Sequence, residues 1–121
     1  MALHVTSARK FWDGVTLTQT TDSATIPVGS HIEGRVFLDA DVSAGTWTPK
    51  IQQQDPKTGQ WFDRGDISMS AFTTTGGPLG DGQNQKQMVT IDNLGSRIRV
   101  SITPAGATPS IVINGVYEGK T

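Results

Sequence analysis

The sequence predicts an all-β fold, a single antiparallel β-sandwich or jelly-roll-like domain of about eight short strands. Residues 97–103 alternate apolar with polar side chains, which is the pattern of a strand that buries one face, and in residues 111–114 Ile111 and Ile113 alternate with Val112 and Asn114. Turn signals rich in glycine and proline recur at intervals of roughly 8 to 12 residues, a spacing typical of sandwiches and small barrels. No segment of useful length carries the periodicity of a helix.

The composition limits the classes of function. The 121 residues suffice for one domain, which by size scaling buries roughly two-thirds of the surface that the unfolded chain exposes. Cysteine is absent from the sequence, so disulfides and thiolate sites are excluded. The formal net charge is -1 and the basic residues are scattered, which argues against nucleic acid and anionic membrane as partners. Charged residues make up only 17%, and such a surface can dock on protein without desolvating many charges.

The N-terminal part of the sequence differs in pattern from the remainder of the chain. We expect residues 1–30 to form an N-terminal arm plus the first strand or strands, and residues 31–121 to form the β-sandwich domain. Phe11 and Trp12 directly precede a turn signal, so they either plug one end of the sandwich or anchor the arm on a neighbouring subunit. The chain lacks an apolar run long enough for a membrane span and opens without the pattern of a secretory signal, so we expect synthesis in a cytoplasm.

The middle of the chain reads as a series of strands and turns. Residues 31–40 and 45–54 both alternate, and the turn over residues 55–59 should pair the second of them with residues 60–63 in an antiparallel hairpin. Trp61 is the predicted central side chain of the core. A further alternating run, residues 66–72, is predicted to be another strand.

A long loop is predicted over residues 73–87. The segment is rich in glycine and almost devoid of apolar side chains, apart from Leu79, and it should be mobile in isolation. Loops of this length usually bind something, although a disordered excursion is nearly as common. Residues 88–91 form the next short strand.

The C-terminal stretch, residues 97–117, contains two alternating segments joined by a linker. Pro104 and Pro109 bound that linker, and neither can donate a backbone hydrogen bond to a sheet ladder. We therefore predict either a β-hairpin or a crossing from one sheet to the other. The rest of the chain should supply strands that cover the apolar side of this unit.

Candidate catalytic residues are scarce. His4 and His31 lie in separate segments, and the chain has no Gly-x-Ser-x-Gly elbow that would accompany a nucleophilic serine. A zinc site of histidine and cysteine is excluded because the chain has no cysteine. The prediction is a protein that is not an enzyme and that has no catalytic residue, no metal ligand and no cofactor.

Acidic pairs and a familiar tripeptide have ordinary interpretations. Asp39 with Asp41, or Asp63 with Asp66, could form a calcium site or a glycosidase pair, but the EF-hand spacing is absent and turn aspartates are far more common. Residues 64–66 spell the Arg-Gly-Asp tripeptide of cell adhesion. In a chain without a secretion signal, we interpret it as a coincidence.

The tryptophans allow a second class of function. Trp12, Trp47 and Trp61 could stack on sugar rings if they lie exposed on a sheet, which would make the domain a carbohydrate-binding module. Three tryptophans in a small sandwich more often belong to the core and its rim.

Several motifs together resemble small β-sandwich virion proteins of tailed bacteriophages. They are TPKIQQ at residues 48–53, DPKTGQW at 55–61, LGSRIRVSIT at 94–103 and TPS at 108–110. In those proteins a strand with Ile-Gln leads through an Asp/Gly turn to a tryptophan, and a later Arg-x-Arg-Val strand precedes a Thr-Pro-Ser strand start. The resemblance covers roughly residues 45–117 and leaves residues 1–30 outside.

The resemblance implies a structural role in the virion, first as a capsid decoration (cement) protein and next as a tail or baseplate component. The implied partners are the major capsid protein and neighbouring copies of the chain, with a trimer as the analogous oligomer. The implied location is the capsid surface, after synthesis in the host cytoplasm. The residues that we expect to contact the capsid or another partner are Phe11, Trp12, Leu79, Asp81 and Gln83.

Overall fold

A computed structural model describes residues 6–121 and confirms the all-β fold. Seven strands form one antiparallel sheet, and the described residues contain no helix. The strands are β1 (Thr6–Leu17), β2 (Thr21–Asp22), β3 (Ile26–Pro27), β4 (Glu33–Gln54), β5 (Trp61–Asp63), β6 (Gln85–Ile91) and β7 (Arg97–Lys120). Residues 6–121 thus contain seven strands where about eight short ones are predicted, and two of the seven are long.

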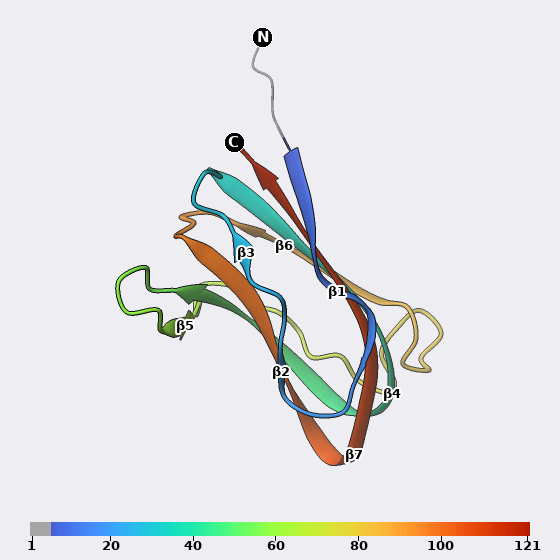
Figure 1. Cartoon of the computed structure of the whole chain (residues 1–121). Helices are drawn as coiled ribbons and strands as arrows, with labels where there is room; N and C mark the ends of the chain where they lie inside the picture. The colour runs from blue at the N-terminus through green and yellow to red at the C-terminus, as the bar shows by residue number, and fades with distance from the viewer. Residues whose placement is uncertain (1–5) are drawn as a thin grey trace.

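The two long strands, β4 and β7, pair with each other along almost their entire length. The pairing runs from Glu33 opposite Lys120 to Gln53 opposite Ile98, and its register shifts twice between Val42 and Thr46. Both strands bend sharply at this place, so that the two-stranded ribbon folds back on itself (Figure 1). The bend divides the continuous sheet into two layers, which gives the sandwich-like shape.

The remaining strands follow the same bent path. In the first layer, β1 pairs with the C-terminal half of β7, and β6 pairs with the N-terminal half of β4. In the second layer, β2 and β3 pair with the N-terminal half of β7, and β5 pairs with the C-terminal half of β4. Each layer is therefore built from segments that lie far apart in the sequence.

Two glycines form the corner between the layers. Gly45 has a φ of 83° and Gly106 a φ of 127°, which are conformations that residues with a Cβ rarely adopt. A Cβ on Gly45 would lie 2.8 Å from the carbonyl oxygen of Ala105 and 2.9 Å from Cβ of Pro109. The two strands can therefore approach closely at the bend only because Gly45 has no side chain.

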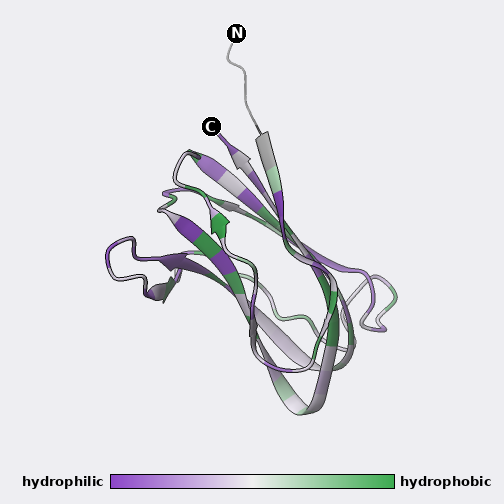
Figure 2. Ribbon diagram, viewed as in Figure 1, coloured by the Kyte–Doolittle hydropathy of each residue, from purple (hydrophilic) through white to green (hydrophobic). Residues whose placement is uncertain are grey.

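The hydrophobic core lies between the layers, and alternate residues of both long strands are buried in it. Figure 2 shows the corresponding change between hydrophobic and hydrophilic residues along the strands. Trp47 and Tyr117 are its largest fully buried side chains. Trp61, predicted as the central core residue, is instead only partly buried on the outer surface, with the guanidinium carbon of Arg99 4.2 Å from its ring centroid. The prediction is wrong because Trp61 lies on a three-residue edge strand, whereas Trp47 lies on a central one.

Two predicted strands differ from the structure. Residues 97–117 form no hairpin, because both alternating segments belong to the single bent strand β7, and Pro104 lies opposite Trp47 inside the pairing. The linker is thus the crossing from one layer to the other, the second of the two predicted alternatives. Residues 66–71 form no strand, and only Phe72 makes an isolated bridge, with Trp47.

The N-terminal segment is integrated into the sheet. β1, β2 and β3 pair with β7 from Lys120 to Arg97, so the predicted boundary near residue 30 separates no arm from a domain in the described residues. Residues 1–5 lie outside the part of the chain that the structure describes, and the arm prediction for them stays a prediction.

The corner makes Gly45 a sensitive position. We expect Gly45→Ala to lower the free energy of unfolding by about 2 to 3 kcal/mol, because the new Cβ meets backbone and the positive φ becomes strained. Urea unfolding followed by tryptophan fluorescence measures the loss. Gly65→Ala is the matched control, since a Cβ there has no neighbour within 4 Å and should change stability by less than about 0.5 kcal/mol. Equal effects of the two substitutions would contradict the account of the corner.

Candidate interaction surface

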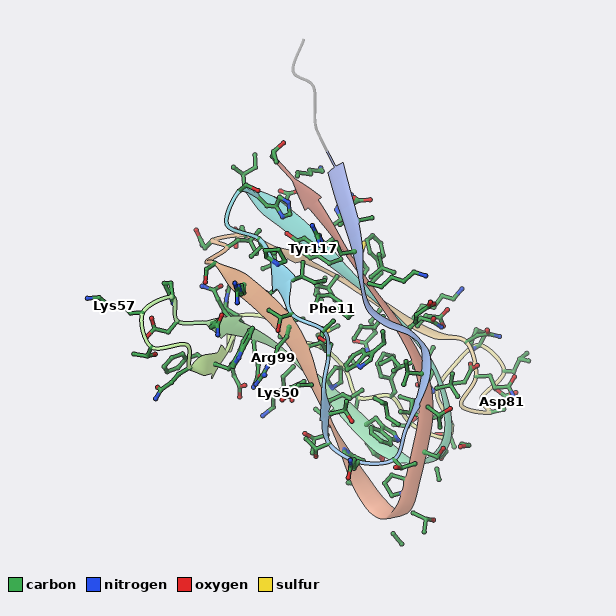
Figure 3. All side chains as sticks on the ribbon, in the orientation of Figure 1. Phe11, Lys50, Lys57, Asp81, Arg99 and Tyr117 are labelled. Carbon is green, nitrogen blue, oxygen red and sulfur yellow. The ribbon has the colours of Figure 1, made fainter. Side chains whose placement is uncertain are left out.

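Phe11 and Trp12, two of the predicted contact residues, are buried in the core. The register of β1 against β7 shifts on both sides of Trp12, so this bulge lets two adjacent side chains face inward. Phe11 packs edge-on against Tyr117, with ring centroids 6.3 Å apart (Figure 3). These aromatics therefore plug the sandwich, and the prediction that their side chains contact a partner is corrected.

The other predicted contact residues lie in the loop that precedes β6. Leu79 and Asp81 lie within residues 76–82, a segment closed by the hydrogen bond from the amide of Gly82 to the carbonyl oxygen of Gly76, and Gln83 follows at its base. Leu79, Asp81 and Gln83 are all exposed, and Leu79 has 78% of its surface accessible, the largest fraction among the exposed large hydrophobic side chains that the structure describes. Figure 3 shows Asp81 on the opposite side of the molecule from Lys57, which lies on the turn before β5. The loop thus presents an apolar side chain on a projection away from the core.

The base of this loop is ordered by hydrogen bonds, although the sequence predicts a mobile segment. The buried Gln85 side chain donates to the carbonyl oxygens of Thr73 (2.7 Å) and Gly82 (2.8 Å) and accepts from the amide of Thr73 (3.1 Å). Asp41 in β4 accepts from the amide of Asn84 at 2.7 Å. The last predicted loop residues belong to β6, which begins at Gln85. These bonds hold the loop tip in a defined position relative to the first layer.

The outer face of the first layer carries a row of apolar side chains. Val116 in β7, Phe37 in β4 and Met88 in β6 are direct cross-strand neighbours, and we call these three residues the outer apolar row. Phe37 is 37% exposed and Met88 56%. A shallow groove of about 420 Å³ runs beside the row, and Asp39 and Lys86 contribute to its lining.

The sequence reasoning missed this row. Phe37 lies between two inward-facing residues, Val36 and Leu38, and its period-2 partners Arg35 and Asp39 are charged. The alternation itself places Phe37 on the solvent side. The outward position of Phe37 could therefore be predicted from the sequence. The alignment of Phe37 with Met88 could not, because it depends on a strand pairing that no local pattern reveals.

On the outer face of the second layer, polar side chains form hydrogen bonds and ion pairs with one another. Arg99 forms an ion pair with Asp22 at 3.3 Å and donates to Gln52, which in turn donates to Asp63 at 2.8 Å. The hydrogen bond from Gln52 and the charge of Lys50 hold the pKa of Asp63 below its usual value. Since Arg99 also covers a face of Trp61, this layer offers no bare aromatic platform among the described tryptophans.

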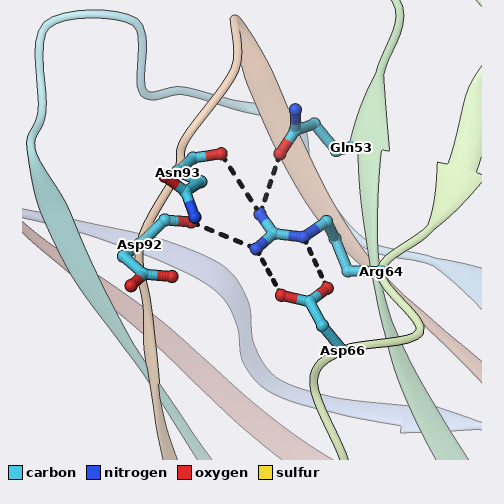
Figure 4. A network of polar contacts seen from close by, with 5 residues as sticks. All are labelled: Gln53, Arg64, Asp66, Asp92 and Asn93. Atoms are coloured by element: carbon cyan, nitrogen blue, oxygen red, sulfur yellow. Dashed lines mark hydrogen bonds and ion pairs between the residues drawn. The ribbon is translucent and has the colours of Figure 1, made fainter.

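The Arg-Gly-Asp tripeptide is engaged within the fold (Figure 4). Arg64 binds Asp66 through two charge-assisted hydrogen bonds of 2.9 and 2.8 Å, and it also donates to the side chain of Gln53 and to the carbonyl oxygens of Asp92 and Asn93. The contact with Arg64 lowers the pKa of Asp66. This arrangement agrees with the interpretation of the tripeptide as a coincidence, because Arg64 joins the turn after β5 to the turn after β6.

His31 contacts Tyr117 at the opposite end of the first layer from the corner. Nδ1 of His31 lies 2.8 Å from the phenol oxygen of Tyr117, and the two rings are stacked. Gly34 and Gly119 lie against these rings, and a Cβ on either glycine would collide with them. The geometry gives the histidine a packing role. His4, the other candidate, lies outside the described residues.

The described residues contain no group of three or more metal-ligating side chains. Asp39 and Asp41 lie on the same face of β4, and Asp41 accepts the hydrogen bond from the loop. Asp63 and Asp66 are bound to different partners.

Within residues 6–121, no helix is long and apolar enough to cross a membrane. Comparisons with protein-family models, curated proteins and solved structures found no significant match to this chain.

Tyr117 provides an optical test of the packing at this end. Burial raises the pKa of this single tyrosine to about 12, from 10.0 in a solvated side chain. Because the pKa is higher in the folded chain, its contribution to stability is complete below pH 10 or so and is lost as the pH rises toward 12.

We expect the tyrosinate absorbance to appear near pH 12 in the wild-type chain and to be absent from Tyr117→Phe. A transition near pH 10, while circular dichroism still reports the folded sheet, would show that the phenol is solvated.

Proposed function

We propose that this chain is a non-enzymatic structural protein of a tailed-bacteriophage virion, and that it acts as a capsid decoration (cement) protein. The motifs between residues 45 and 117 support this proposal through their resemblance to small virion proteins. The observation that carries it structurally is Leu79, an exposed apolar side chain on a loop whose base is tied to β4 and β6. The proposed partner of this loop is the major capsid protein, and the proposed location is the capsid surface.

The ordered base of the loop makes it suited to adhesion. A segment that must become ordered on docking loses conformational entropy, which weakens binding. The hydrogen bonds of Gln85 and Asp41 restrict the loop before it binds, so more of the contact energy appears as affinity. A cement protein needs no chemistry, since binding to the assembled shell alone stabilises that shell by mass action.

Repetition strengthens such contacts. Each copy can make a small contact, because many copies on a symmetric shell bind at once when they also touch one another. The 17% of charged residues keeps the desolvation cost of such contacts low.

The carbohydrate-binding alternative has less support from the geometry. Trp12 and Trp47 are buried, and Arg99 covers a face of Trp61. A sugar would have to displace Arg99 from both Trp61 and Asp22 before it could stack on that face of the indole. No described feature favours a tail or baseplate location over the head.

Substitution at the loop tip tests the proposal. We expect Leu79→Asp to weaken binding to expanded capsid shells of the chain's own phage by at least about tenfold, because it places a charge where an apolar contact is proposed. Co-sedimentation of the purified chain with shells that lack it measures the occupancy.

Ile32→Asp is the matched control. Ile32 is 70% exposed, like Leu79, but lies between β3 and β4. We expect this variant to bind as the wild type does. Failure of the wild-type chain to bind shells would overturn the proposed location, and equal losses for both variants would overturn the role of the loop.

A further inference from the structure

The outer face of the first layer has two features that a fully solvated sheet does not need. It carries the outer apolar row, and it carries two opposite charges that are not paired with each other. Asp39 and Lys86 are cross-strand neighbours on β4 and β6, yet in the described part of the chain neither makes an ion pair.

The other charged side chains near this face bind within the chain. Asp41 accepts the hydrogen bond from the amide of Asn84, and the remainder form ion pairs. Lys10 binds Asp13 at 3.2 Å, Arg35 approaches Glu118 at 3.8 Å and Lys120 approaches Glu33 at 3.4 Å. These pairs are all partly exposed, so each adds little to stability. They neutralise the surroundings of the outer apolar row and leave Asp39 and Lys86, both beside the groove, as the charges open to an external partner.

We propose that two copies of the chain pack face to face through this surface, about a two-fold axis that runs parallel to the strands between β4 and β6. A two-fold interface must be complementary to itself, since each contact occurs twice. This proposal goes beyond the capsid contact and does not depend on it, because the pairing is a property of the isolated chain.

The strand register supplies the self-complementarity. Phe37 lies opposite Met88, and Asp39 lies opposite Lys86 two residues further along. Rotation about an axis midway between the two strands places each residue over its cross-strand neighbour in the other copy. Asp39 then faces the second copy's lysine and Phe37 faces its methionine, and both contacts are repeated by symmetry.

The shape of the face agrees with such a pair, and its size predicts a weak one. Met88 is 56% exposed beside the groove, and a flexible methionine side chain fits irregular apolar surface well. About this axis β4 and β6 of one copy lie over β6 and β4 of the other, and two strands about 4.8 Å apart and about seven residues long give a footprint on the order of 200 Å². Standard interfaces bury about 800 Å² per partner, so we expect a specific but weak association, with a dissociation constant in the high micromolar range.

Sedimentation equilibrium of the purified chain from about 1 μM to about 500 μM tests the pairing. We expect a monomer–dimer equilibrium, and we expect Met88→Asp to raise the dissociation constant by at least about tenfold. Thr48→Asp is the control, since Thr48 is exposed on the outer face of the second layer and should leave the equilibrium unchanged.

Charge reversal tests the proposed register. Asp39→Lys alone places like charges opposite each other in both symmetric contacts, and so does Lys86→Asp alone, so each variant should remain monomeric where the wild type pairs. A mixture of the two variants restores opposite charges at both contacts. We therefore expect the mixture to form a heterodimer with an affinity close to that of the wild type.

Three results would overturn the proposal. They are a wild-type chain that stays monomeric across the concentration range, a closed trimer, and a dimer that neither Met88→Asp nor the charge reversals weaken. A monomer whose binding to capsid shells is lost in Met88→Asp would instead assign this face to the shell. Since these measurements use the isolated chain, their failure leaves the loop contact at Leu79 untouched.

Discussion

The rest of the structure depends on the pairing of β4 with β7 through a shared bend. The ladder runs from Glu33 to Gln53 in β4 and from Lys120 to Ile98 in β7, with two register shifts at the corner. The bend at Gly45 and Gly106 converts a ribbon too long for a small domain into two facing layers. Trp47 and Tyr117 on these strands are then enclosed from both sides. The N-terminal strands, β5 and β6 need only extend the two layers that this ribbon creates.

This arrangement also explains how much of the fold the sequence predicts. Period-2 alternation identifies the inward faces of residues 31–40 and 97–103 because it is a local property of a strand. The prolines at 104 and 109 suggest an interruption, yet the strand continues past them, since a bend requires fewer ladder hydrogen bonds than a straight ladder. Whether such a linker closes a hairpin or crosses between layers is decided by the distant segment 44–46, which no local pattern contains.

The candidate surfaces, too, depend partly on local sequence pattern and partly on strand pairing between distant segments. Composition predicts that residues 73–87 either bind something or form a disordered excursion, and the structure shows that Leu79 in that loop is exposed. The order of the loop comes from Gln85, an ordinary polar residue in the sequence that becomes a buried anchor only when β6 pairs with β4. The outer apolar row likewise forms only because the strand register places Phe37 beside Met88 and Val116. Phe11 and Trp12 show the reverse error, because a bulge turns two adjacent aromatics inward where strict alternation would expose one of them.

The central claim is that both layers are one cooperative unit, because the β4–β7 ladder passes from one layer to the other with only two register shifts at the corner. Native-state hydrogen exchange of the β4 amides tests it most directly, by comparing Val36 and Leu38 before the corner with Ile51 and Gln52 after it. We expect the most protected amides on both sides to exchange with the same opening free energy, within about 0.5 kcal/mol. Opening of one layer at a free energy lower by about 2 kcal/mol or more, while the other stays protected, would contradict the claim.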